Sequence, residues 1–198
     1  DEACPYLFDA ATSIIQRGKV EIHARKEKNL PEGWVIDQDG QPASDPHQIL
    51  QGLIRDENAL LPLGGAGEDF GGHRGYGLSN IVEILSASLQ SGAFLHGLTG
   101  GDTSGKPQPY RIGHFFMAMD IEQYLPLDEF KHNIGDLLRE LRNSKKAQGH
   151  DRIYLAGEKE FESEKLVRKQ GIPVLPSLQK ELKYLQSELE LSEIILPF

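Results

Sequence analysis

The chain has 198 residues with a formal net charge of −9, and 38% of its residues are hydrophobic. This composition is ordinary for a globular protein of one large or two small domains. The acidic balance argues against a nucleic-acid partner, because neutralising phosphates requires clustered Lys and Arg. No run approaches the ~18 apolar residues that a membrane span needs, so no membrane partner is expected.

Cysteine usage and the start of the chain bear on its cellular setting. The single cysteine, Cys4, has no partner for an intrachain disulfide. We expect no secretion signal, since no basic-then-apolar leader is present, and a cytoplasmic setting is the prediction. The chain begins at Asp1 and soon enters the apolar run Tyr6–Phe8. We therefore expect a fragment of a longer chain, with a processed or trimmed start as the alternative.

The N-terminal part gives mixed structural signals. A short strand is predicted over residues 5–8, ending at Asp9. Thr12 or Ser13 is a candidate cap for a following helix, although the alternating apolar residues over 20–24 fit a strand as well. Glycine, proline and aspartate then predict loops at 30–34 and 37–40.

The rest of the chain has clearer periodicity. Helical spacing of apolar residues predicts helices over 78–89, 128–141, 160–170 and 177–189. Asp128 and Ser177 are expected to begin two of these helices, and Gly92 and Gly171 to end the other two. Strands are predicted over 111–120, 153–155 and 172–175, and a loop over 98–110. The alternation of helices and strands indicates an α/β or mixed α+β fold.

The densest chemical signal is a glycine-rich segment. Seven of the fourteen positions over 64–77 are glycine, and an amphipathic helix follows. Such a backbone can approach a ligand closely, and a helix start offers N–H groups that attract phosphate or carboxylate. His73 and Arg74 lie at this start, and Arg74 adds a fixed positive charge. An anion site and a flexible surface loop both fit the pattern, which is neither a P-loop nor a Rossmann fingerprint.

Two other turns carry charged residues. Asp9 follows the first predicted strand, where a carboxylate can orient an imidazole, hold a substrate hydroxyl or cap a helix. Gly157, Glu158, Lys159 and Glu160 follow the predicted strand over 153–155. This second turn fits a contact with a ribose or a phosphate, and an ordinary strand-to-helix turn is the alternative.

Several further sites are not supported by the sequence. Asp37-x-Asp-Gly resembles the start of a calcium loop, but its twelfth position is Gln48 and its glycine comes too early. The seven histidines lack metal-ligand spacing with one another, so no metal site is predicted. His114 is expected to be a packed strand residue rather than a catalyst. Without a Gly-x-Ser-x-Gly elbow, a hydrolase triad has no anchor.

An ordered set of segments resembles the type-2 malate/L-lactate dehydrogenase family, whose relatives include ureidoglycolate and sulfolactate dehydrogenases and diketogulonate reductase. The segments follow the family order and cover most of the chain, with the C-terminal end less distinctive. They are Phe8–Ser13 with Arg17–Lys19, Leu30–Gly40, Leu61–Gly65, Arg74–Leu78, Glu83–Leu85 with Ser91–Ala93, Gly113–Phe116 and Gly157–Glu158.

The resemblance implies reversible hydride transfer between NAD(H) or NADP(H) and a small 2-oxo or 2-hydroxy acid, in a cytoplasmic homodimer with a non-Rossmann NAD(P)-binding fold. It implies a cofactor-binding domain over residues 1–125 and a helical and strand segment over 126–198 that packs back on an N-terminal part. It also favours a helix over 13–28. The implied cofactor contacts are Leu7, Phe8, Asp9, Ala10, Ala11, His73, Arg74, Gly157, Glu158 and Lys159.

Two departures from the family pattern affect these expectations. Many members carry Lys where Arg74 stands and a shorter loop than residues 66–72, which bears on cofactor preference and loop closure. The catalytic Ser-His-Gly segment and the substrate-binding arginine of the family belong to an N-terminal region before the matched part. We therefore expect this chain to hold the cofactor without the proton-transfer histidine, and the N-terminal part of the enzyme to be its partner. A nucleotide- or phosphate-binding module without redox activity and a scaffolding fragment are the alternatives.

Overall fold

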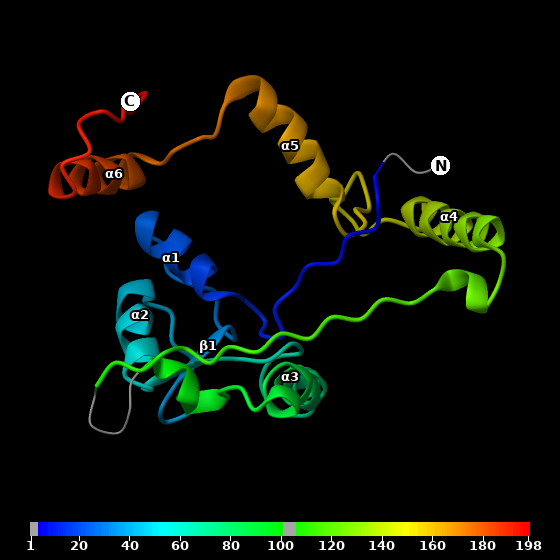
Figure 1. Cartoon of the computed structure of the whole chain (residues 1–198), viewed down its shortest axis with the longest axis horizontal. Helices are drawn as coiled ribbons and strands as arrows, with labels where there is room; N and C mark the ends of the chain where they lie inside the picture. The colour runs from blue at the N-terminus through cyan, green and yellow to red at the C-terminus, as the bar shows by residue number, and fades with distance from the viewer. Residues whose placement is uncertain (1–3, 101–105) are drawn as a thin grey trace. The chain divides into compact units, whose positions relative to one another are not determined.

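A computed structural model describes residues 4–100 and 106–198 (Figure 1). Contacts divide the chain into two units, one formed by Ala11–Met117 and one by the residues up to Ala10 together with Ala118–Phe198. Helices dominate the described residues, and the strands form one two-stranded sheet. The chain is therefore a mixed helix-and-strand protein. None of the described helices is both long and apolar enough to span a membrane.

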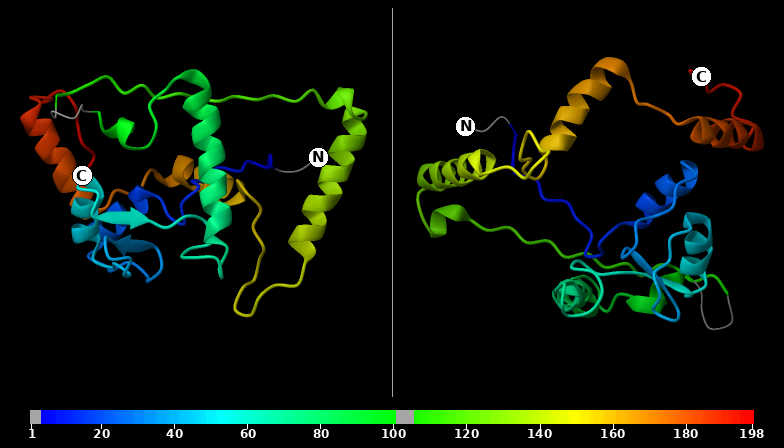
Figure 2. Two further views of the ribbon diagram at one scale, coloured as in Figure 1. Left: turned by 90° about the horizontal axis from the view of Figure 1, so that it is seen from below. Right: turned by 180° about the vertical axis from the view of Figure 1, so that it is seen from behind.

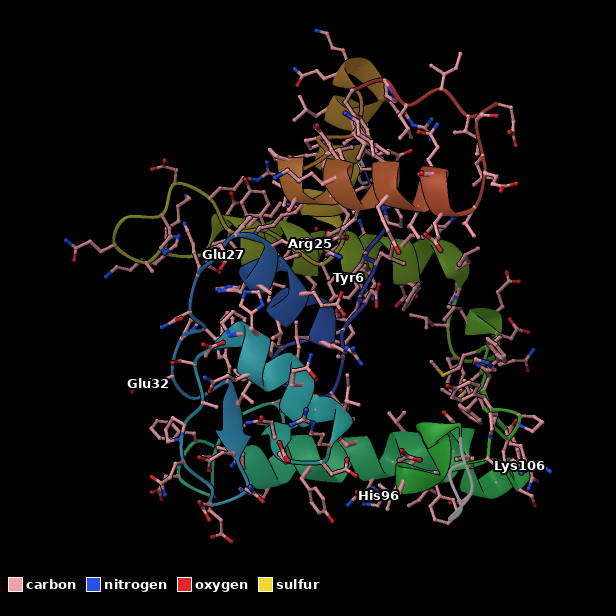
Figure 3. The ribbon with its side chains drawn as sticks, turned by 90° about the vertical axis from the view of Figure 1, so that its left-hand side faces the viewer. Tyr6, Arg25, Glu27, Glu32, His96 and Lys106 are labelled. Atoms are coloured by element: carbon pink, nitrogen blue, oxygen red, sulfur yellow. The ribbon has the colours of Figure 1, made fainter. Side chains whose placement is uncertain are left out.

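The unit formed by Ala11–Met117 holds both strands. Its elements are α1 (Arg17–Arg25), β1 (Val35–Asp37), α2 (Pro46–Ile54), β2 (Asn58–Leu60), α3 (Gly72–Ser86) and the 3-10 helices η1 (Ser88–Gln90) and η2 (Leu95–Thr99). β1 and β2 pair antiparallel, with Val35 opposite Leu60 and Asp37 opposite Asn58. Arg25 and Glu27 lie at the C-terminal end of α1 (Figure 3).

A small apolar core joins α1, α2 and the sheet. α1 buries Val20 and Ala24, which are four residues apart and therefore share one face of the helix. α2 begins after Asp45, whose carboxylate accepts the N–H groups of His47 and Gln48, with Pro46 at the first helical position. The buried members of the core are Ile15, Val20, Leu30, Val35 and Ile49.

The other unit is helical among its described residues. Its elements are η3 (Ile121–Gln123), α4 (Leu127–Asn143), α5 (Glu158–Gln170) and α6 (Pro176–Glu188). The right-hand view of Figure 2 shows α4 and α5 as separate helices joined by an irregular loop. α4 buries Leu138 on its apolar face, and Gly171, with φ 84°, follows the last turn of α5. Tyr6, near the start of the extended N-terminal segment, is exposed (Figure 3).

The strands predicted over 5–8, 111–120, 153–155 and 172–175 are wrong as strand assignments. These segments contain no described β-strand, and their backbones have isolated bonds instead of ladders. The Leu7 N–H donates to the Ala156 carbonyl, and the Ala93 N–H donates to that of Arg111. Apolar alternation favours an extended backbone, but a strand also needs a neighbouring edge. The two real strands, of three residues each, are too short to show a period and were not predicted.

Helices were predicted better than their caps. The helix within 13–28 is confirmed as α1, so the strand alternative over 20–24 is wrong. Neither Thr12 nor Ser13 caps it, because Gln16 precedes its first turn and Ser13 forms a bridge with Pro62. α3 begins at Gly72, earlier than residue 78.

The observed N-caps of α4 and α6 differ from the predicted ones. Ser177 does not begin α6, since Leu175 is the N-cap and Pro176 the first helical residue. Asp128 lies in the first turn of α4, after the N-cap Pro126. Residues 101–105 of the loop predicted over 98–110 lie outside the described residues.

Candidate functional site

A cavity of about 380 Å³ lies between the extended segment at residues 7–9 and the turn that begins α5. This volume falls in the range of small-ligand pockets. It brings together two segments far apart in the sequence, and five of the predicted cofactor contacts lie on its wall. Its lining residues are Leu7, Phe8, Asp9, Tyr154, Leu155, Ala156, Gly157, Lys159 and Glu160.

A glycine makes the close approach of these two segments feasible. Gly157 is the N-cap of α5 with φ 92°, a left-handed conformation that side chains rarely adopt. A Cβ added there would lie 3.0 Å from Leu7 Cβ and 3.3 Å from Leu7 N. The Leu7 N–H donates to the Ala156 carbonyl at 3.1 Å. The cavity wall therefore depends on a position where only glycine fits comfortably.

Glu158 is the buried carboxylate beside this turn, but it does not line the cavity. Its side chain is 4% exposed and accepts from Arg142 Nε at 2.7 Å and from the Leu155 N–H at 3.1 Å. Arg152 lies 3.3 Å from its second oxygen. The Leu155 N–H, followed by the arginines, holds the pKa of the Glu158 carboxyl below its ordinary value despite burial. Both oxygens of this carboxylate therefore accept hydrogen bonds from protein groups.

Tyr154 adds an aromatic wall flanked by two cations. The Arg152 guanidinium lies 4.6 Å from the ring centroid and Lys159 Nζ lies 4.9 Å from it, both in cation–π geometry. Asp9 and Glu160 are exposed acidic residues on the same cavity wall. The cavity thus offers an aromatic face, a lysine cation and two carboxylates, which suits a ligand with both ring and polar parts.

Sequence reasoning did not find Tyr154 or the two arginines of this region. Tyr154 was assigned to a short strand, and its side-chain direction is not encoded in a three-residue apolar run. The arginines reach Glu158 across 16 and 6 residues of sequence, beyond the range of local patterns. Glu160 belongs to the same charged turn as Gly157, Glu158 and Lys159 in the sequence, and in the structure it lines the cavity.

The glycine-rich segment belongs to the Ala11–Met117 unit, and much of it packs against itself. A Cβ at Gly72 would overlap the Gly65 carbonyl, and one at Gly75 would overlap that of Leu63. A Cβ at Gly64 would lie 2.6 Å from the Gly71 carbonyl. These glycines permit the loop to fold tightly on the first turns of α3, so the segment is not a freely flexible surface loop.

His73 and Arg74 lie in the first turn of α3 and do not line the cavity at residues 7–9. Both are exposed, and neither side chain bonds to another residue within the part of the chain that the structure describes. The Arg74 N–H donates to the Gly71 carbonyl at 2.9 Å. Of the remaining predicted contacts, Ala10 is the last residue of the N-terminal segment of one unit, and Ala11 is the first residue of the other unit.

Two alternatives from the sequence are settled by the structure. Asp9 is not a helix cap, because α1 begins at Arg17 and the backbone at Asp9 is extended and irregular. His114 is not a packed strand residue, since it is exposed and stacks on Phe116 with ring centroids 6.1 Å apart.

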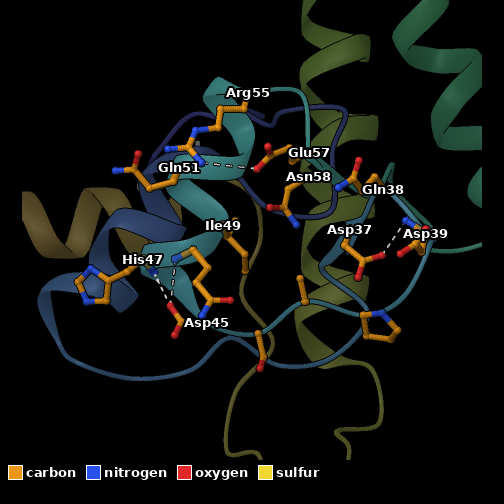
Figure 4. A pocket seen from close by; sticks show the side chains of 14 residues that line it. Asp37, Gln38, Asp39, Asp45, His47, Ile49, Gln51, Arg55, Glu57 and Asn58 are labelled. Atoms are coloured by element: carbon orange, nitrogen blue, oxygen red, sulfur yellow. Dashed lines mark hydrogen bonds and ion pairs between the residues drawn. The ribbon is translucent and has the colours of Figure 1, made fainter.

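Another cavity, of about 840 Å³, lies beside the sheet and α2 (Figure 4). Two of the acidic residues that line it, Asp37 and Asp45, already accept backbone N–H groups. Asp37 accepts the N–H groups of Asp39 and Gln41 at 3.0 and 2.8 Å, and Asp45 caps α2. Across residues 4–100 and 106–198, no group of three or more His, Cys, Asp and Glu side chains is placed to hold a metal ion. This cavity is better explained by turn geometry than by ligand chemistry.

Comparison with known proteins identifies the family. The model of the malate/L-lactate dehydrogenase family matches residues 1–183. The chain belongs to the malate/L-lactate dehydrogenase family. The resemblance predicted from the ordered segments is therefore confirmed.

Similar members of the malate/L-lactate dehydrogenase family come from several organisms. Malate dehydrogenase of Pyrococcus horikoshii is 40% identical over 178 residues, 90% of this chain and 47% of that protein. L-sulfolactate dehydrogenase of Methanocaldococcus jannaschii is 35% identical over 94% of this chain and 49% of its own length. The crystal structure of malate dehydrogenase from Entamoeba histolytica matches with a TM-score of 0.87 and 42% identity, covering 100% of this chain and 54% of that one. The chain thus spans about half the length of these relatives.

Proposed function

We propose that the chain is the cofactor-holding part of an oxidoreductase that transfers a hydride between NAD(H) or NADP(H) and a small 2-oxo or 2-hydroxy acid such as malate or lactate. Family membership supports the reaction class, and the names of the relatives support the acid. The observation that carries the proposal is the cavity joining residues 7–9 to the Gly157 turn, because it assembles predicted cofactor contacts from both ends of the chain.

The residues around this cavity fit part of a dinucleotide. Gly157 lets the backbone come close to a ligand, Lys159 supplies a cation for a phosphate, and the rings of Phe8 and Tyr154 offer apolar faces. Asp9 has a supporting role, accepting a hydrogen bond from a ligand hydroxyl. When bound, the nicotinamide ring supplies the carbon that accepts or donates the hydride. The protein residues bind and orient the cofactor.

A second group of predicted contacts lies at the start of α3, and we propose that it binds an anionic part of the cofactor. His73 and Arg74 are exposed there, and the first N–H groups of a helix carry a partial positive charge. Ala10 and Ala11 are proposed contacts whose small side chains leave the backbone accessible.

We also propose the type of fold, the division into domains and the cellular location. A non-Rossmann fold is supported by the antiparallel pairing of β1 and β2, since a Rossmann fold needs a parallel sheet. We keep the division into a cofactor-binding domain over 1–125 and a C-terminal segment over 126–198 that packs back on an N-terminal part of the enzyme. A cytoplasmic location is proposed from the acidic, cysteine-poor composition.

Protein partners are proposed from exposed apolar side chains. Tyr76 and Ile81 on α3 are exposed, and Phe116 is 87% exposed. Apolar patches of this kind mark interaction surfaces. We propose that they are covered by an N-terminal part of the enzyme and by a second copy in a homodimer.

Isothermal titration calorimetry of the chain with NADH, NADPH and ATP tests the proposed function. We expect NADH or NADPH to bind, and ATP to bind far more weakly. Lys159→Ala should weaken dinucleotide binding, while Lys165→Ala, on the same helix beside Phe161, serves as the matched control. If ATP bound as tightly as NADH or NADPH, a phosphate-binding module would be favoured. If neither NADH nor NADPH gave a measurable heat of binding, the proposal would be rejected.

A further inference from the structure

A single buried carboxylate connects three segments around the cavity. Glu158 begins α5, and its carboxylate accepts from Arg142, near the end of α4, at 2.7 Å. It also accepts from Arg152 at 3.3 Å and from the Leu155 N–H at 3.1 Å. Such charge-assisted bonds at a 4% exposed side chain are stronger and more directional than surface ion pairs.

Two hydrogen bonds between Leu155 and Glu158 fix this turn, one through the Glu158 carboxylate and one through the Glu158 N–H. The Leu155 N–H donates to the Glu158 carboxylate, and the Glu158 N–H donates back to the Leu155 carbonyl at 3.2 Å. This reciprocal pair resembles a capping box, in which a side chain and a backbone group satisfy each other at a helix start. The turn can therefore hold Gly157 in its left-handed conformation and aim the Ala156 carbonyl outward.

The same turn also holds the opposite wall of the cavity, at residues 7–9. The outward Ala156 carbonyl accepts the Leu7 N–H at 3.1 Å, and Gly157 approaches Leu7 too closely for a Cβ. Leu7 is followed by Phe8 and Asp9, which also line the cavity. A contiguous path of bonds therefore leads from the carboxylate to the wall without Glu158 reaching the cavity.

We infer that Glu158 is a positioning residue of the cofactor site: its carboxylate, held by Arg142 and Arg152, sets the position of residues 7–9 and touches no ligand. The inference rests on the proposed function for the identity of the ligand, but not for the geometry. It changes the role expected from the family resemblance, in which Glu158 contacts the cofactor. Arg152 also pairs with Glu162 at 2.5 Å.

Two measurements on Glu158→Gln separate the parts of this inference. The first is amide hydrogen exchange, which reports local opening without any ligand. We expect the Leu7 and Leu155 amides to exchange faster, with the amides of α6 unchanged. The second is the dissociation constant of NADH, which we expect to rise about tenfold, equivalent to about 1.4 kcal/mol.

Matched variants distinguish positioning from general destabilisation. Glu164→Gln removes a surface pair with Arg168 on the same helix and should alter neither readout. Arg142→Lys keeps a cation for the carboxylate and should retain most of the Leu7 protection, whereas Arg142→Met should lose it. This pair also serves if Glu158→Gln does not fold.

The outcomes are distinct for the inference and for the function. Unchanged exchange at Leu7 in both Glu158→Gln and Arg142→Met would overturn the positioning role, whether or not NADH binds. Faster exchange at Leu7 with no NADH binding to the unaltered chain would leave the positioning role standing and reject the proposed function. Faster exchange with an unchanged NADH dissociation constant would show that the wall at residues 7–9 is not part of the cofactor site, and would overturn the inference.

Discussion

At the scale of single residues, a few backbone and charge requirements define the candidate site. Gly157 permits the approach of Leu7, Glu158 fixes the turn, and Lys159 supplies the cation of the cavity. These three adjacent residues were predicted to contact the cofactor, but they have three different physical roles in the structure. The difference arises from side-chain direction, which a motif does not specify.

Gly157→Ala should destabilise the protein more than an ordinary glycine replacement. Its φ of 92° disfavours any side chain, and the new Cβ would lie 3.0 Å from Leu7 Cβ. We expect a loss of about 2–3 kcal/mol in the free energy of unfolding, measured by urea denaturation. Gly149→Ala is the control, because φ there is 80° but no atom lies within 4 Å of the added Cβ. Equal losses in the two variants would show that Leu7 does not contribute.

Arg74→Ala should weaken cofactor binding. The exposed guanidinium at the start of α3 lies beside helix N–H groups that favour anions. The expected loss is about 1–3 kcal/mol of binding free energy, the usual worth of a charge-assisted hydrogen bond. Calorimetry with NADH measures it, and Arg17→Ala, which removes a surface pair with Glu21, is the control. An unchanged dissociation constant would remove Arg74 from the site.

Glu158 should make stability depend on pH in the acidic range. Its native pKa lies below the ordinary value of 4.5, so its stabilisation is present above pH 4.5 and is lost as the pH falls through the lower native pKa. Urea unfolding between about pH 3 and pH 7 measures this loss. Glu158→Gln should flatten the acidic part of the profile compared with Glu164→Gln. Parallel profiles in the two variants would contradict the assignment.

At the scale of elements, tight glycine packing links the segment over 61–71 to the first turns of α3. Gly75 faces the Leu63 backbone, whereas Gly77, half a turn further, has open space around it. The sequence shows only that both are glycines. Their different surroundings decide which one the fold requires.

Gly75→Ala and Gly77→Ala should therefore have opposite effects. An alanine Cβ at 75 overlaps the Leu63 backbone, and we expect a loss of at least about 2 kcal/mol in the free energy of unfolding. At 77, alanine should stabilise the helix by about 0.5–1 kcal/mol through its higher helix propensity. Thermal unfolding followed by circular dichroism measures both. Similar effects of the two changes would show that the loop does not pack as described.

Elements that depend on interactions within one stretch of chain were predictable from the sequence. Elements that depend on pairing between distant stretches were not. α4 and α5 have a helical period or charged turns in one stretch of chain, and each was expected close to its observed bounds. The segment over 111–120 alternates like a strand but lacks a paired edge, while β1 and β2 gain their pairing from each other across 20 residues. Likewise the resemblance located Gly157, but not the arginines that hold its neighbour.

At the scale of the whole molecule, apolar exposure is the feature that most affects behaviour in solution. Ile81 and Ile84 on α3 and Phe116 beyond it are all exposed. Exposed apolar side chains of this kind are typical of interaction surfaces. Whole-molecule organisation is the level that the sequence of this chain predicts least, because an exposed apolar side chain does not specify which surface packs against it.

We expect the chain to self-associate through these apolar side chains. Sedimentation velocity should show a sedimentation coefficient that rises with protein concentration and changes little with salt, because apolar contacts are not screened by ions. Ile81→Lys combined with Phe116→Lys should shift the distribution toward monomer, whereas Lys131→Glu and Lys180→Glu, on other helices, should not. A monomer at every concentration would contradict the proposed interface.

The self-packed loop before α3 has a kinetic consequence. Because Gly64, Gly72 and Gly75 hold that loop against its own helix, the amides at the start of α3 are in place before any anion arrives. Capture of a ligand there would need no slow folding of the loop around it. The rate of encounter would then be set by diffusion and by the surrounding charge, and substitutions that loosen the loop would lower the association rate constant.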